Sequence, residues 1–269
     1  MDKLLAILEA EMTEPTNYGW FHLMFIAIIV AATVFLCVKC RDVSDKHFRR
    51  IIFISWVVLV LLEIYKQLVY SVEYTNGEFV WDYQWYAFPY QFCSSPLYAL
   101  PFVAFLPDGK VRDAFVGFIS FFSLFAGVAV FLYPNDVFIA TTGINIQTMV
   151  HHGSQIVLGI YAAVYYRKRL SIRYYLRSIP VFVAFLFVAM VLNIAGYHAF
   201  AAAGIDETFN MFYVSPYFEC TLPVLSLVYP AVPYAVFFLM YCIGFSIAAL
   251  VMYFLIYLPI HLVSRRKNA

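Results

Sequence analysis

A cysteine lies in a polar cluster inside an otherwise apolar segment. Residues 88–96 read FPYQFCSSP, which places Gln91, Cys93, Ser94 and Ser95 between two prolines. A cysteine without such neighbours usually behaves as a small hydrophobe. It becomes a good nucleophile when a base or a cation lies next to it. The chemistry of Cys93 therefore depends on what another segment brings to it.

A pair of adjacent histidines can supply that base. In the stretch NIQTMVHHGSQ (145–155), one helical face carries Gln147, His151 and Ser154, and the next face carries Thr148, His152 and Gln155. A lone histidine within a membrane span is often a satisfied core residue. A helix that is polar on two adjacent faces instead predicts a wet cavity. We expect His151 or His152 to serve as the base.

Other polar side chains also fall within apolar runs, where ionisable groups are costly and usually functional. Glu63 and Lys66 are three residues apart, so they can form an ion pair. One interpretation is that they only neutralise each other and brace the bundle. The other is that they bind substrate together with Asn193 and Asn210.

The elements that must position these residues are membrane-spanning helices. The chain of 269 residues is 64% hydrophobic and 12% charged, whereas soluble domains average about 25% charged. Apolar runs near 20 residues predict an all-α, polytopic helical bundle that forms a single domain over residues 1–269. The expected spans are roughly 20–38, 51–70, 87–106, 114–132, 143–166, 179–199 and 235–260.

The connecting segments alternate in charge and thereby predict the orientation. Of the 17 basic residues, 15 lie in 39–50, 107–113, 167–178 and the C-terminal tail, and the other two are Lys3 and Lys66. Acidic residues, among them Asp136, occupy the alternate segments. Basic loops stay cytoplasmic. We therefore expect seven spans with the N-terminus outside and the C-terminus inside.

Counting along the spans places polar groups at one depth. At about 1.5 Å per residue from the cytoplasmic ends, five residues lie about 20–26 Å into a hydrocarbon core of about 30 Å: Glu63, Cys93, His152, Asn193 and His22. Lys66 lies one turn further out. This predicts a polar pocket in the outer third of the membrane. The aromatic, proline-rich segment 200–234 is expected outside, as an interfacial belt, a lid over the pocket, or both.

Three stretches resemble one family. They are FPYQFCSSP (88–96), MVHHGSQIVLGIY (149–161), and the run from FNMFYVSP (209–216) to YLP (257–259). Their order and spacing resemble the bacterial YwaF-type integral membrane proteins and the related eukaryotic transmembrane protein 164. The resemblance implies a bacterial cell membrane and an acyltransferase that works through a cysteine thioester. It assigns Cys93 as nucleophile and His152 as base, and it matches Gly153 and Asn210. Gln91 departs from it, because a histidine is common there.

These observations support three functions. The first is a lipid acyltransferase or lipid hydrolase acting on a membrane phospholipid or other acyl lipid, with Cys93 attacking an ester and Gln91, Ser94 or Ser95 binding the oxyanion. The second is a proton-coupled transporter that uses Glu63, Lys66 and the histidines. The third is a non-catalytic lipid-binding protein. The five cysteines show no zinc spacing. We expect no metal, no cofactor and no nucleic-acid partner.

Overall fold

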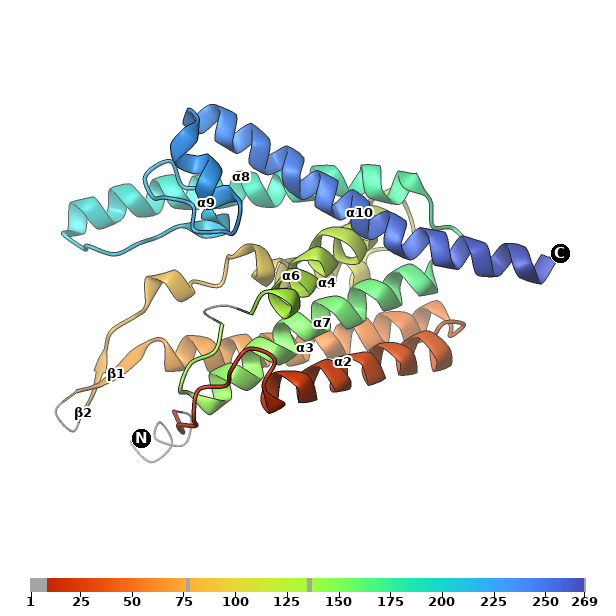
Figure 1. Ribbon diagram of the computed structural model, residues 1–269, viewed down its shortest axis with the longest axis horizontal. Helices are drawn as coiled ribbons and strands as arrows, with labels where there is room; N and C mark the ends of the chain where they lie inside the picture. Colours follow the sequence, from red (N-terminus) through yellow and green to blue (C-terminus); the bar gives the residue numbers. More distant parts are fainter. Residues whose placement is uncertain (1–8, 76–77, 135–136, 269) are drawn as a thin grey trace.

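The computed structural model describes residues 9–75, 78–134 and 137–268, and it is mostly helical (Figure 1). Asp136 lies outside the described residues, as do the side chains of the basic tail residues 265–267. The elements follow in chain order: α2 (Trp20–Lys39), α3 (Asp45–Val69), β1 (Val72–Thr75), β2 (Glu78–Trp81), η1 (Trp85–Ala87), η2 (Phe92–Ser94), α4 (Ser95–Phe105), α5 (Lys110–Gly117), η3 (Phe118–Ser123), α6 (Leu124–Leu132), α7 (Thr142–Tyr165), α8 (Ile172–Ala203), η4 (Met211–Tyr213), α9 (Leu225–Val228), η5 (Tyr229–Ala231) and α10 (Tyr234–Asn268).

Five helical segments of the described chain are long and apolar enough to cross a membrane: Trp20–Lys39, Asp45–Val69, Lys110–Leu132, Ile172–Ala203 and Tyr234–Leu262. The 24-residue α7 is not among them, since polar residues interrupt its apolar character. The segment Phe92–Phe105 is apolar but short. The protein is therefore a multi-pass helical membrane protein, and the number seven for its spans stays a prediction.

Local sequence signals set where the helices begin and end. α3 begins at Asp45, inside the loop expected at 39–50, because the Ser44 side chain caps it by accepting the His47 N–H. An acidic residue in the first turn also favours this start. α8 begins before and ends after the expected span 179–199. It stops where Gly204 adopts a left-handed conformation, φ 67°, which favours glycine.

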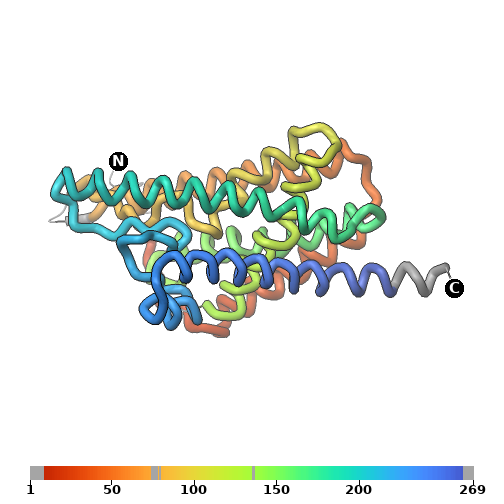
Figure 2. Tube along the Cα trace, turned by 90° about the horizontal axis from the view of Figure 1, so that it is seen from above, coloured from red at the N-terminus to blue at the C-terminus, as the bar shows by residue number. Residues whose placement is uncertain are grey.

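α7 is the central helix of the bundle. It packs against α2 and α3 on one side and against α6 and η3 on the other, and α8 and α10 lie beyond (Figure 1). In the view of Figure 2, α8 and α10 run across the bundle. Aromatic rings fill the core between these layers. Phe122 stacks on Phe182 at 4.7 Å between centroids, and Phe92 meets Phe245 edge-on at 4.9 Å.

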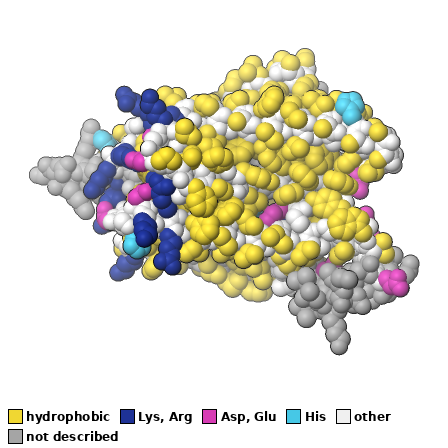
Figure 3. Space-filling model, turned by 180° about the vertical axis from the view of Figure 1, so that it is seen from behind, with side chains coloured by type: hydrophobic (Ala, Val, Ile, Leu, Met, Phe, Trp, Pro, Cys, Tyr) yellow, Lys and Arg dark blue, Asp and Glu magenta, His cyan; other side chains and the backbone are white. Residues whose placement is uncertain are grey.

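The basic loops converge at one end of the molecule (Figure 3). Ion pairs join them: Arg167 to Asp42 at 2.5 Å, Arg169 to Asp108 at 2.6 Å, and Arg177 to Asp113 at 2.6 Å. The guanidinium of Arg169, hydrogen-bonded to Asp108, holds the pKa of that carboxyl below its usual range. The segments 39–50, 107–113 and 167–178 therefore form one charged end, as the alternation of charge predicted. The compartment that this end faces stays a prediction.

Gly127 allows α6 to approach α7 at the level of the histidines. A Cβ atom at this position would lie 2.6 Å from the backbone oxygen of His152 and 2.9 Å from the Gln155 Cβ. Because backbone cannot yield as a flexible side chain does, we expect Gly127→Ala to lower the free energy of unfolding by about 1–3 kcal/mol. Thermal unfolding in detergent would measure this loss.

Gly244→Ala is the matched control. This exposed glycine lies in α10, and nothing lies within 4 Å of the position of its added Cβ. Alanine is the better helix former, so this variant should be as stable as the parent protein or slightly more stable. Equal melting temperatures for the two variants would contradict a close α6–α7 approach.

Candidate functional site

The chain enters α4 through an irregular segment, not through a full span. The expected span 87–106 is not one continuous helix, since Phe88 and Gln91 have extended ψ angles and the α-helix begins only at Ser95. Pro96 lies in the first turn of α4, where the missing N–H costs nothing. The Tyr98 hydroxyl donates to the Pro89 carbonyl at 2.6 Å and holds the irregular segment against the helix.

Two side chains of α7 hold the backbone of Cys93. The Nε2 atoms of His151 and Gln155 lie 2.9 Å and 2.6 Å from the Cys93 carbonyl oxygen. His151 and Gln155 are four residues apart, so they project from the same face of α7. The predicted site residues Cys93, His151 and Gln155 are therefore in direct contact.

Backbone carbonyls also determine the tautomers of the two histidines. A carbonyl oxygen only accepts, so His151 donates from Nε2 to Cys93 and keeps its lone pair on Nδ1, which is buried without a partner. His152 Nδ1 lies 2.8 Å from the Thr148 carbonyl and is therefore the donor, which makes Nε2 the basic atom. A general base of the Cys–His type has its second nitrogen held in this way.

The thiol of Cys93 is half-buried and free of disulfides. Within the described part of the chain, no hydrogen bond joins it to either imidazole. Next to Cys93, the Ser94 and Ser95 side chains are buried, and among the described residues the Ser95 hydroxyl has no partner. An unpaired hydroxyl thus accompanies the thiol at the N-terminal end of α4, where the helix dipole is positive.

Glu63 and Lys66 form the predicted ion pair, with Lys66 Nζ 2.8 Å from Glu63 Oε1. Gln67 also donates to Glu63 Oε1, at 2.7 Å, and to the Ala87 carbonyl at 2.8 Å. The second carboxylate oxygen of Glu63, Oε2, is buried and has no partner among the described residues. Gln67 therefore links Glu63 on α3 to the segment before Cys93, and one acceptor of the carboxylate stays unused.

The predicted ligands Gln91 and Asn193 bind the lid, by which we mean residues 205–233. Asn193 donates from Nδ2 to the Met211 carbonyl (3.0 Å) and accepts the Met211 N–H at Oδ1 (2.6 Å). Gln91 donates from Nε2 to the Asn210 carbonyl (3.1 Å) and accepts the Phe212 N–H at Oε1 (3.0 Å). The two carboxamides thus pair backbone N–H and C=O groups of residues 210–212, much as neighbouring strands pair with each other in a sheet.

Asn210 organises the lid itself. Its Oδ1 accepts the Ser215 N–H at 2.9 Å and its Nδ2 donates to the Glu219 carbonyl at 3.1 Å. Phe212 and Tyr213 follow with positive φ angles of 58° and 56°, which are uncommon for non-glycine residues. The resulting turn sets the Phe212 ring against Phe92, 5.5 Å between centroids. The lid therefore lies directly against the FPYQFCSSP segment.

Tyr213 is a site residue that the sequence did not single out. It follows Phe212, whose ring lies 5.5 Å from the ring of Phe92, the residue before Cys93. The lid segment contains many aromatic residues, and no spacing signal distinguishes this tyrosine from the others. The turn that places Tyr213 here is formed by the positive φ angles of Phe212 and Tyr213. The Gln91 and Asn193 carboxamides bind the backbone just before Tyr213.

Two further polar residues of the predicted spans make other contacts. Gln147 is buried on α7 one turn before His151, where its Oε1 accepts from the Thr148 hydroxyl at 3.5 Å. His22 packs in a separate aromatic cluster, 5.4 Å from Phe131 and 5.7 Å from Phe138 between ring centroids. In the described chain, no group of three histidine, cysteine, aspartate or glutamate side chains is arranged to hold a metal ion.

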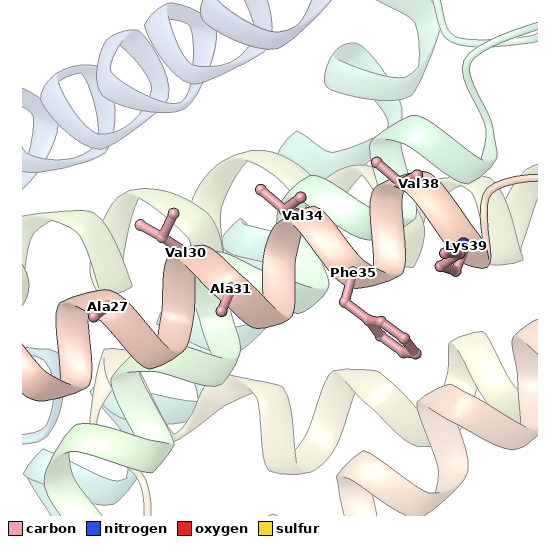
Figure 4. A pocket seen from close by; sticks show the side chains of 7 residues that line it. All are labelled: Ala27, Val30, Ala31, Val34, Phe35, Val38 and Lys39. Carbon is pink, nitrogen blue, oxygen red and sulfur yellow. The ribbon is translucent and has the colours of Figure 1, made fainter.

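A shallow hollow on α2 offers no chemistry. Every residue that lines it comes from this one helix (Figure 4): Ala27, Val30, Ala31, Val34, Phe35, Val38 and Lys39. Apart from the terminal lysine, these side chains are apolar, and Phe35 is 60% exposed. An apolar helix face of this kind is what a bilayer covers.

The fold and the site together define an integral membrane protein with a polar, thiol-containing site between its helices. The model of the TMEM164 family matches residues 17–257, so the chain belongs to the TMEM164 family. This family is known as an acyltransferase family. No curated protein and no solved structure matches the chain. The predicted relation to transmembrane protein 164 is confirmed, and the bacterial YwaF-type naming stays a prediction.

Proposed function

We propose that the protein is a phospholipid acyltransferase that carries the acyl group on Cys93. The thiolate attacks the carbonyl carbon of a lipid ester, the C–O bond breaks, and a Cys93 thioester forms as the lipid alkoxide leaves with a proton. An acceptor hydroxyl then attacks the thioester and regenerates the thiol. The arrangement that carries the proposal is the half-buried thiol at the start of α4, beside two histidines whose tautomers are set by backbone carbonyls.

The two histidines take different roles in this proposal. His152 is the general base, since its Nδ1 is occupied by the Thr148 carbonyl and Nε2 is left basic. It removes the thiol proton and returns it to the departing alkoxide. His151 is a positioning residue, because its Nε2 is committed to the Cys93 carbonyl. The Ser95 hydroxyl, buried and unpartnered, is the side chain best suited to donate to the oxyanion.

A thioester-trapping experiment tests the proposal. The protein is reconstituted in vesicles that contain a phospholipid with an alkyne-tagged acyl chain, and the reaction is stopped with acid. We expect a label on Cys93 that neutral hydroxylamine removes, followed by transfer of the tag to an added lysophospholipid. Binding of the tagged lipid with no label on Cys93 and no transfer would instead support the non-catalytic lipid-binding alternative.

Replacing each histidine in turn distinguishes the general base from the positioning residue. We expect His152→Ala to slow single-turnover thioester formation by about 10²–10⁴-fold, the usual worth of a general base. His151→Gln retains a donor for the Cys93 carbonyl and should slow it by less than about tenfold. The rise of thioester formation with pH should disappear only in His152→Ala. The reverse order of effects would make His151 the base.

The orientation and membrane of the protein follow from its charged end. The basic loops face the cytoplasm and the lid lies outside, so the site opens to the outer leaflet of a cell membrane. The expected bacterial plasma membrane, with seven spans, belongs to the same proposal. A cysteine introduced at Gly109 in a cysteine-free variant should resist a membrane-impermeant maleimide in intact cells, and one at Asp206 should react. The opposite labelling pattern would reverse the orientation.

A further inference from the structure

A groove runs along the outside of α3, next to the site. It has a volume of about 610 Å³, within the range of ligand pockets, and its walls come from α3, the turn before α4, the start of α4 and β2. On and just after α3 the lining residues form two rows. One row is apolar, Val60, Ile64 and Leu68, and the other is polar, with Glu63 and Gln67 on α3 and Ser71 just after its end. The α3 side opens to the bilayer, since Ile64 is 51% exposed.

Most polar atoms along the groove are already paired. Gln67 donates to Glu63 and Ala87 and accepts from the Tyr83 hydroxyl at 2.6 Å. The Ser71 hydroxyl donates to the Gln67 carbonyl at 2.5 Å. Among the buried polar side-chain atoms of the described residues that line the groove, the exception is Glu63 Oε2, an acceptor on a side chain that is only 7% exposed. A buried acceptor without a donor is costly. The groove therefore has a place for a ligand that brings a donor.

The charge state of Glu63 restricts which donor fits. Lys66 already neutralises this carboxylate at 2.8 Å. A second cation beside Lys66 would be repelled, whereas a neutral hydroxyl completes the hydrogen bonding without adding charge. The groove is also lined by Pro89 and Leu97, which flank Cys93 in the chain. A hydroxyl held by Glu63 would thus lie beside the segment that carries the acyl group.

We propose that this groove binds the acyl acceptor, a single-chain lipid whose chain lies along Val60, Ile64 and Leu68 and whose free hydroxyl donates to Glu63 Oε2. The inference rests on the proposed acyltransferase function. It adds the location of the acceptor and the residue that holds its hydroxyl. Glu63 is a binding residue here, and the acceptor reaches it sideways from the bilayer, without passing the lid.

The test measures the two half-reactions separately with a lysophospholipid as acceptor. In Glu63→Gln an amide N–H₂ replaces the free acceptor oxygen, so we expect the KM for the acceptor to rise at least tenfold. Thioester formation from the donor phospholipid should stay within twofold of the parent protein. Ile64→Trp, which fills the groove from an exposed position, should give the same result. Leu61→Trp, on the same helix but outside the groove and 60% exposed, is the matched control and should change neither step.

Several outcomes would overturn the inference. An acceptor KM within twofold of the parent value in both Glu63→Gln and Ile64→Trp would remove the groove from acceptor binding. Equal slowing of both half-reactions would make Glu63 a structural or donor-site residue. Competition by a diacyl phospholipid as strong as by the lysophospholipid would exclude a single-chain site. Absence of any thioester in the parent protein would instead refute the proposed function, which keeps the two failures distinct.

Discussion

Cys93→Ser is expected to lower the initial rate of acyl transfer between phospholipids by about 10³-fold or more, the loss typical of removing a covalent nucleophile. Serine retains the shape of the side chain, but at neutral pH its hydroxyl is a much weaker nucleophile than a thiol. The Cys93 carbonyl, which His151 and Gln155 hold, is unchanged by the substitution. The variant should therefore fold as the parent protein does. Product analysis after reconstitution in vesicles measures the rate.

Cys242→Ser is the control for this experiment. Cys242 is also a half-buried free cysteine, but it lies in α10, where its carbonyl accepts the Ser246 hydroxyl at 2.7 Å. We expect this variant to transfer acyl groups at the parent rate. If Cys93→Ser retained more than about a tenth of the parent activity, the thioester could not lie on the reaction path.

The second large effect concerns the lid. Gln91→Leu removes both hydrogen bonds to the backbone at Asn210 and Phe212 and leaves a carbonyl and an N–H unpaired. Each unsatisfied buried group costs about 1–3 kcal/mol. A lid loosened by about 1.4 kcal/mol opens about tenfold more often. Water would then reach the thioester, so we expect the ratio of fatty acid released to acyl group transferred to rise about tenfold.

Gln84→Leu provides the matched comparison. The Gln84 amide makes only long hydrogen bonds to its neighbour Asp82, at 3.3 Å and 3.5 Å, and none to the lid. In this variant the ratio of fatty acid released to acyl group transferred should equal that of the parent protein. Hydrogen exchange of residues 205–216 gives an independent measure, and it should be faster only in Gln91→Leu. Unchanged exchange and unchanged partitioning in that variant would show that Gln91 does not hold the lid.

These contacts explain the departure at Gln91. The family that the sequence resembles often has a histidine at this position. A glutamine cannot replace a histidine as an acid or a base. In this chain both polar atoms of the Gln91 amide bind lid backbone. An amide does not titrate, so its role is to hold the chain in place. In the proposed mechanism, the histidines of α7 serve proton transfer.

Much of the architecture was predictable from the sequence. Apolar runs of about 20 residues can only satisfy their backbone within a bilayer as helices. Five of the expected spans accordingly match long apolar helical segments, some with extended ends: α2, α3, Lys110–Leu132, α8 and α10. The alternation of basic and acidic loops predicted one charged end, because charges cannot stay in hydrocarbon. The i, i+4 spacing on α7 likewise put His151 and Gln155 on one face.

The tertiary structure decided what each polar side chain does. Depth along a span follows from counting residues, and it correctly brought α7 to the level of Cys93. The rotation of a helix and the path of a non-helical segment depend on contacts between distant parts of the chain. Counting therefore could not separate His22, in its aromatic cluster, from the residues near the thiol. It also could not reveal that Gln91 and Asn193 bind the backbone around Met211.

The FPYQFCSSP segment shows most clearly which features the sequence predicts and which the tertiary structure decides. Its prolines and polar residues by themselves indicated an unusual polar cluster inside an apolar span, and the structure places Cys93 just before the regular α-helix with its carbonyl available to other side chains. Which groups would meet that carbonyl depended on packing between α4, α7 and the lid. An unpaired polar group inside a membrane must find a partner wherever the fold offers one. In this protein the partners are His151 and Gln155, some 60 residues further along the chain.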